Sequence, residues 1–91
     1  MAASVRREGE ALVFAGALER TSVAALWRQA QPLLAGARRL ELGAVEAVDS
    51  AGLALLAELA ERAGAAVVGA PPGLGELRAA YRLNEGLGYA G

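Results

Sequence analysis

Short apolar runs alternate with segments of helical periodicity along this chain, and that alternation restricts the fold to a few topologies. Residues 11–18 and 65–68 resemble strands, because they are short, aliphatic and bounded by polar or glycine residues. A helix that joins two successive strands is a crossover connection, which favours parallel pairing of those strands. We therefore expect an α/β fold in which a small mixed β-sheet packs against α-helices.

The strands are expected at four places. Residues 5–7 pair with residues 11–18 as a hairpin through Gly9, and residues 39–42 and 65–68 form the other two strands. The residues that follow the third strand, 43–48, are expected to form a connection to the next helix. The predicted order is strand, strand, helix, strand, helix, strand, helix.

The first helix is predicted from a cap and a periodic apolar pattern. Thr21 or Ser22 offers a hydroxyl cap, and apolar residues then recur at helical spacing through about residue 35. Pro32 lies inside this pattern, where it removes a backbone donor and clashes with the preceding turn. We expect the helix to kink or end near Gln31.

The second helix has signals at both ends. Asp49 and Ser50 are preferred capping residues, residues 51–63 carry an apolar stripe, and Gly64 is a stop signal. After the last strand, the sequence Pro-Pro-Gly at 71–73 predicts a turn. A final helix is then indicated by the spacing of Leu74, Leu77 and Tyr81.

Length and composition exclude several classes of protein. A chain of 91 residues supports one hydrophobic core and hence one domain, residues 1–91. Its nine basic residues are all Arg and are scattered, which disfavours nucleic-acid binding. No apolar run approaches the roughly 18 to 20 residues of a membrane span, so we expect no direct membrane insertion and a cytoplasmic location.

The residue types needed for most catalytic chemistry are missing. The sequence has no His, no Lys and no Cys, which removes the usual nucleophilic triads, the phosphate-binding P-loop and the common metal sites. Asp49 is its only Asp, and no pair of carboxylates has the pattern of an acid–base site. We expect no enzymatic activity, no cofactor and no metal.

The most concentrated signal is VDSAGLALL, residues 48–56, where a strand-like approach is followed by two capping residues and an apolar helix. By itself this pattern describes a capped, buried helix. It also resembles the D-S/T-x-G-L signature of STAS domains, the fold of sulfate transporters and anti-sigma-factor antagonists. The resemblance covers the whole chain in element order, through ALVFAGAL, LELGAVEAVDSAGL and PPGLGELRAAYRLNEGL. Gly43 departs from it, because many members have Ser there.

Within that family, the dipeptide LW in the first helix, GLALL after the signature and the short chain are most similar to the STAS subunit of bacterial Mla phospholipid ABC transporters. The resemblance implies a non-enzymatic cytoplasmic subunit that binds the transporter's ATP-binding subunit, in a complex with a permease and a lipid-binding subunit. Such a subunit is peripheral to the inner membrane through its partner. The alternative is an anti-sigma-factor antagonist switched by phosphorylation of Ser50.

The residues expected to bind the partner are Trp27, Asp49, Ser50, Ala51, Gly52 and Leu53, with Ser50 also a candidate phosphosite. Small residues at a helix N-terminus allow another protein's surface to approach closely. Trp27 is the only Trp, and is either an interface anchor or a residue at the edge of the core. Binding of a lipid or small ligand inside the domain is disfavoured, because a thin core of small side chains must be densely packed.

Overall fold

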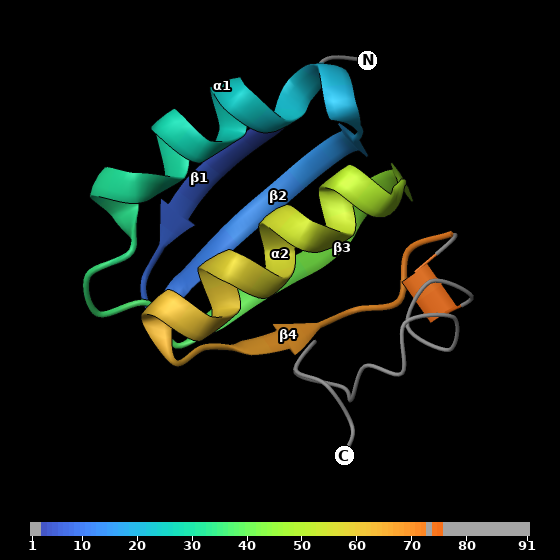
Figure 1. The fold of residues 1–91 in the computed structure, drawn as a ribbon. Coiled ribbons are helices and arrows are strands. Elements are labelled where there is room, and N and C mark those ends of the chain that lie inside the picture. Colours follow the sequence, from blue (N-terminus) through green and yellow to red (C-terminus); the bar gives the residue numbers. More distant parts are fainter. Residues whose placement is uncertain (1–2, 73, 76–91) are drawn as a thin grey trace.

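The computed structural model describes residues 3–72 and 74–75. They form a four-stranded sheet with the strand order β1-β2-β3-β4, covered by two α-helices (Figure 1). In chain order the elements are β1 (Ser4–Glu8), β2 (Ala11–Leu18), α1 (Arg20–Ala30), the short 3-10 helix η1 (Gln31–Leu33), β3 (Arg39–Val48), α2 (Ser50–Ala63) and β4 (Ala66–Val68). The predicted α/β class with a small mixed sheet is confirmed.

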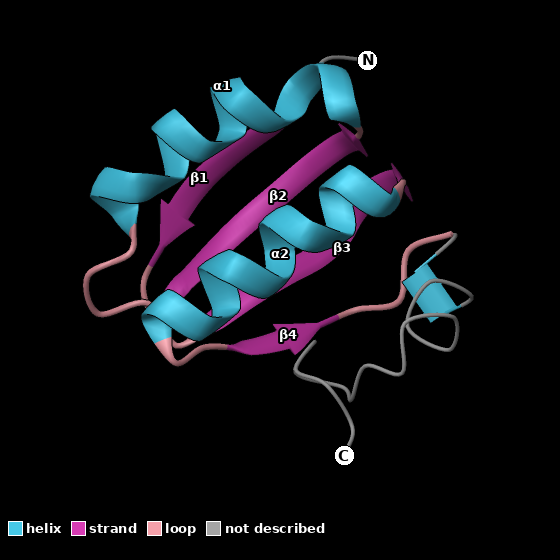
Figure 2. Ribbon diagram, in the orientation of Figure 1, coloured by secondary structure: helices cyan, strands magenta, loops and turns pink. Residues whose placement is uncertain are grey.

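Both helices lie on one face of the sheet. β1 and β2 form an antiparallel hairpin, whereas β2, β3 and β4 are parallel, so that α1 and α2 are crossover connections. Right-handed crossovers that advance in the same direction across a sheet place their helices on the same side. Accordingly, α1 and α2 lie next to each other over one layer of strands (Figure 2).

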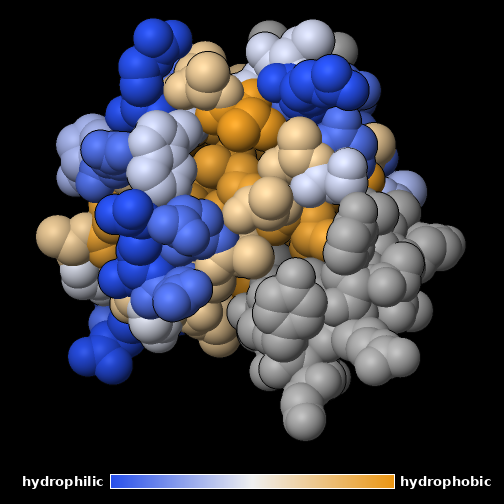
Figure 3. All heavy atoms as spheres, viewed as in Figure 1, coloured by the Kyte–Doolittle hydropathy of each residue, from blue (hydrophilic) through white to orange (hydrophobic). Residues whose placement is uncertain are grey.

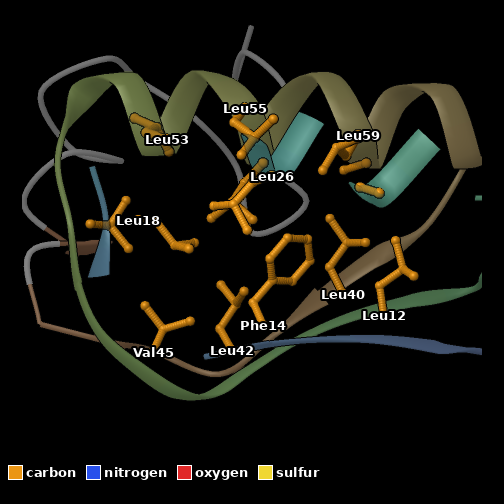
Figure 4. Packing of buried hydrophobic residues seen from close by; sticks show 14 of the residues in the cluster. Leu12, Phe14, Leu18, Leu26, Leu40, Leu42, Val45, Leu53, Leu55 and Leu59 are labelled. Carbon is orange, nitrogen blue, oxygen red and sulfur yellow. The ribbon is translucent and has the colours of Figure 1, made fainter. Parts of the chain in front are cut away.

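The hydrophobic core fills the space between the sheet and the two helices (Figure 4). Phe14 of β2 is its largest side chain and is fully buried. The other large side chains that are fully buried are all leucines: Leu12, Leu18, Leu26, Leu40, Leu42, Leu56, Leu59 and Leu74. Among the described residues no polar or charged side chain is buried, so hydrophobic burial supplies most of the stability of this domain.

Strand β3 is longer than the sequence predicts. Residues 43–48 were expected to form a connection, but β3 continues through them to Val48. The pairing with β2 shifts register twice, and at each shift β3 carries one residue more than β2. As a result the buried residues of β3 change from alternate positions to every third position, at Leu42, Val45 and Val48. The prediction was wrong because apolar residues at every third position lack the alternation that is typical of a strand.

The last strand lies at the edge of the described sheet. β4 pairs with the start of β3, and of its residues only Val67 packs against the core, while Val68 is 45% exposed. The expected core strand is therefore an edge strand here. Beyond it, the N–H of Leu74 donates to the carbonyl oxygen of Pro71 at 3.1 Å. Residues 73 and 76–91, including most of the predicted final helix, lie outside the described residues.

Two predicted helix ends are confirmed. α1 ends at Ala30, and Pro32 lies in η1 directly after it, where its fixed backbone angle suits the first turn of a 3-10 helix. α2 ends before Gly64, which has the left-handed conformation (φ 63°) and donates its N–H to the carbonyl oxygens of Ala60 and Glu61. A residue with a Cβ is strained in that conformation, which explains glycine at this position.

Candidate functional site

The conspicuous signature of the sequence lies where the carboxyl ends of β2 and β3 meet the N-termini of α1 and α2 (Figure 1). We call residues 18–20 and 48–52 the helix-start junction. Its backbone is tied together by the Asp49 N–H, which donates to the Leu18 carbonyl oxygen at 3.1 Å, and by the Leu53 N–H, which donates to the Asp49 carbonyl oxygen at 2.9 Å. The end of β2 is thus joined to the start of α2.

Asp49 caps both α1 and α2. Its Oδ1 accepts a hydrogen bond from the Gly52 N–H at 2.9 Å, within its own helix α2. Its Oδ2 accepts one from the Arg20 N–H at 3.0 Å, in the first turn of α1. Both donors belong to the N–H groups that have no partner within a helix. The prediction that Asp49 caps the second helix is confirmed, and its bond to the first was not foreseen.

The predicted hydroxyl cap on α1 is wrong. Glu19 is the capping residue by position and makes no side-chain cap, while Thr21 and Ser22 lie inside the first turn. Instead of capping, the Ser22 hydroxyl donates to the carbonyl oxygen of Ala17 at 3.1 Å. The side-chain bond to the first turn comes from Asp49, which is 29 residues away in the sequence. A local sequence pattern contains no sign of such a cap.

Gly52 is required for the packing of α2 on β2. It is buried, and a Cβ built on it would overlap the carbonyl oxygen of Leu18 and lie 2.8 Å from the carbonyl carbon. The small residue predicted to make room for a partner protein therefore makes room for the domain's own β2. Leu53 is also buried, at 3% exposure. Of the predicted partner-binding residues of this segment, Asp49 and Ser50 are exposed and Ala51 is half-buried.

Trp27 is half-buried on α1 and packs against the core. The guanidinium of Arg62 lies 5.0 Å from the centre of its ring, within the range of a cation–π interaction, and Arg62 also bonds Glu58 at 2.9 Å. Arg62 is in the last turn of α2, whereas Ser50 is the first residue of that helix. These ends of α2 are separated by about 18 Å, so Trp27 and the signature segment lie toward opposite ends of the helical face.

The exposed residues of the two helices change character along their length. Toward the N-termini, apart from the exposed Arg20 that begins α1, they are small and uncharged: Thr21, Ala24 and Ala25 on α1, Ser50 and Ala54 on α2. Toward the C-termini they are charged or polar: Arg28 and Gln29 on α1, Glu58, Glu61 and Arg62 on α2. Figure 3 shows this face, with apolar residues between the helices and hydrophilic residues at both ends of the face. We call the small exposed residues near the N-termini, together with Ala51, the small-residue surface.

The charge on Asp49 is stabilised by its two caps. The N–H of Gly52, and then that of Arg20, donate to the carboxylate and lower the pKa of Asp49 below its ordinary value. The positive ends of two helix dipoles favour the ionised form in the same direction. Asp49 is therefore a fixed negative charge at the helix-start junction at neutral pH.

Replacing Asp49 by asparagine should remove part of the pH dependence of stability. A carboxyl group whose pKa is lowered on folding stabilises the protein above its unfolded pKa of about 3.9, and this contribution is lost as the pH falls through the folded value. The free energy of unfolding of the parent should exceed that of Asp49→Asn at neutral pH, and the excess should shrink below about pH 4. Urea denaturation of both proteins, from neutral pH to below about pH 4, measures this difference in the free energy of unfolding.

The control for this experiment is Glu58→Gln, which removes an exposed carboxylate from the surface ion pair with Arg62. Such pairs contribute roughly 0 to 1 kcal/mol, so its effect should be small at every pH. If the free energy of unfolding of the parent exceeded that of Asp49→Asn by the same amount at neutral and at acidic pH, that result would contradict a role for the ionised carboxylate.

Comparison with known protein families identifies the family of this chain. The family model described as "Mlab, STAS domain" matches residues 1–89, nearly the whole chain, and includes the helix-start junction. None of the curated proteins matches this sequence. In the part of the chain that the structure describes, no helix has the length and apolar character needed to cross a membrane. Residues 3–72 and 74–75 also bring together no cluster of acidic side chains suited to a metal ion.

Proposed function

Because this chain belongs to the MlaB-like STAS domain family, we propose that it is a non-enzymatic accessory subunit of an ABC-type phospholipid transporter. In this proposal it binds the ATP-binding subunit, an MlaF-like protein, and supports the assembly and activity of the transporter. The same complex contains a permease and a lipid-binding subunit and acts in outer-membrane lipid asymmetry. The chain lies on the cytoplasmic side of the inner membrane, held there by its partner.

The observation that supports docking is the exposure of Ser50 within the small-residue surface. Ser50 and Ala54 on α2, and Ala24 and Ala25 on α1, are exposed on adjacent helices. Short side chains let a partner's backbone and side chains come close to both helices, and they lose little conformational entropy when covered. Asp49 is held by two backbone groups of its own chain, so the surface is already ordered before the partner arrives.

The experiment that tests this proposal is affinity purification of the tagged chain from its native cells, with mass spectrometry of the proteins that accompany it. We expect an ABC ATPase together with its permease, and Ser50 without phosphate. Recovery of a serine kinase with phosphorylated Ser50, and no ABC ATPase, would overturn it.

The second candidate function is that of an anti-sigma-factor antagonist. It is favoured by the residue type and exposure of Ser50, whose hydroxyl stands at the first position of α2, where a kinase can reach it. A phosphate there would add about −2 charge beside Asp49. Neighbouring genes distinguish the two candidates, because transporter genes accompany the first and an anti-sigma kinase gene accompanies the second.

Trp27→Ala tests whether the partner also contacts the other end of the helical face. Trp27 is only half-buried, so we expect the domain to stay folded by circular dichroism. If Trp27 is an anchor, its truncation should weaken binding to the ATP-binding subunit about thirtyfold, equivalent to about 2 kcal/mol. Arg28→Ala, which changes the exposed neighbouring residue, is the control and should bind nearly as tightly as the parent. Unfolding of Trp27→Ala would instead identify Trp27 as a core residue.

A further inference from the structure

We propose that Asp49 is a positioning residue of the docking surface, which fixes the start of α1 relative to the start of α2. The inference rests on the proposed function, because it concerns the geometry of the small-residue surface that receives the partner. The sequence predicts Asp49 as a cap of the second helix and as a contact residue, and the inference adds that it holds two contact-bearing helices in place.

The contacts of its carboxylate support this role. Each oxygen accepts one backbone N–H, Oδ1 from Gly52 in α2 at 2.9 Å and Oδ2 from Arg20 in α1 at 3.0 Å. A carboxylate is an acceptor only, and it has one oxygen for each helix here. One rigid planar group therefore joins the first turns of both helices, and rotation of its side chain would break one bond or both.

A second directional side-chain contact between α1 and α2 lies at their other end. There the Arg62 guanidinium of α2 stands over the Trp27 ring of α1, at 5.0 Å from its centre. Between these two contacts α1 and α2 pack through apolar residues of the core, and apolar contacts are less directional than hydrogen bonds. Without the bond from Asp49 to Arg20, the first turn of α1 is held by the Ser22 hydroxyl bond to Ala17 and by the backbone bond between Asp49 and Leu18, so its position relative to Ser50 is less tightly fixed.

The chain offers a matched pair of variants at Arg20. Arg20→Pro removes the N–H that donates to Asp49, and Arg20→Ala keeps it while deleting the same side chain. Proline is well tolerated at the first position of a helix. The preceding residue, Glu19, already has the extended backbone (φ −124°, ψ 166°) that proline requires before it. Any difference between the two variants therefore reports the lost hydrogen bond.

The first measurement is the distance between α1 and α2 in the isolated protein. The sequence has no Cys, so Ala25→Cys and Ala54→Cys, both at exposed positions, allow spin labelling at two defined places. Double electron–electron resonance should give one narrow distance distribution for the Arg20→Ala protein and a broader or shifted one for Arg20→Pro. Indistinguishable distributions in the two variants would overturn the inference, whatever the partner is.

The second measurement is binding to the purified ATP-binding subunit. We expect Arg20→Pro to bind about tenfold more weakly than Arg20→Ala, equivalent to about 1.4 kcal/mol. Equal binding by the two variants would overturn the claim that docking depends on this link. If the parent protein does not bind the ATP-binding subunit, the proposed function fails, and the distance measurement still decides whether Asp49 fixes the helices.

Asp49→Ser is the second variant, in case Arg20→Pro does not fold. Serine is a good cap for its own helix, but it has a single side-chain oxygen on a shorter side chain. It should keep the bond to the Gly52 N–H and lose the one to the Arg20 N–H, and so broaden the distance distribution as Arg20→Pro does. A distribution as narrow as that of Arg20→Ala would contradict the role assigned to Asp49.

Discussion

Replacing Gly52 with alanine should lower the free energy of unfolding by about 3 kcal/mol, at the upper end of the cost of overpacking a core. The added Cβ would overlap the carbonyl oxygen of Leu18, which is backbone at the end of a central strand and cannot rotate away. α2 would have to move off β2, and buried leucines along it would lose contacts. For a domain of this size the melting temperature should fall by about 12 to 24 °C.

Gly43→Ala is the control for this prediction. Gly43 is exposed on β3, and nothing lies within 4 Å of a Cβ built there. A substitution at such a surface position should change the free energy of unfolding by no more than about 0.5 kcal/mol. Thermal and urea denaturation followed by circular dichroism compare the two variants. If they unfold alike, the close approach of α2 to β2 is not what glycine provides at position 52.

Ser50→Glu should leave the fold intact and weaken binding to the ATP-binding subunit by at least about thirtyfold, or about 2 kcal/mol. Ser50 is exposed at the first position of α2, and a negative charge there is favoured by the helix dipole. The same charge would be covered by the partner and would stand next to the ionised Asp49. Calorimetry with the purified partner measures the affinity, and circular dichroism verifies the fold.

Ser50→Ala separates the effect of the charge from the loss of the hydroxyl group. It adds no charge and keeps the side chain small, so it should bind within a few-fold of the parent. A Ser50→Glu protein with normal circular dichroism and full affinity would show that Ser50 lies outside the interface. If Ser50→Glu and Ser50→Ala lost the same binding affinity, the loss would come from the missing hydroxyl group. Ser50 would then donate or accept a hydrogen bond across the interface, and the added charge would have no effect of its own.

The parts of the fold predicted from the sequence are those with local causes. α2 is predicted within one residue, because Asp49 caps it through Gly52 three residues later and Gly64 ends it in the left-handed conformation. The end of α1 is predicted for the same reason, since Pro32 acts on the turn that precedes it. Such signals lie within a few residues of the structure they determine.

The parts missed depend on neighbours that are distant in the sequence. The sequence predicts a connection where the second half of β3 lies, because the register shifts of this strand are set by its pairing with β2. The partner of the Arg20 N–H is Asp49, and the atom that excludes a side chain at Gly52 belongs to Leu18. That the signature segment binds a partner stays a prediction, whereas within the domain Asp49 caps α2 and also bonds the start of α1, and Gly52 packs on Leu18.

The order of the described strands in space is the same as their order in the chain. During synthesis the residues of β1 and β2 emerge first, and β3 and then β4 each follow the strand with which they pair. No strand has to be inserted between two that are already paired. Each described strand after the first therefore pairs with the strand made just before it, and none has to wait for a later strand to provide its neighbour.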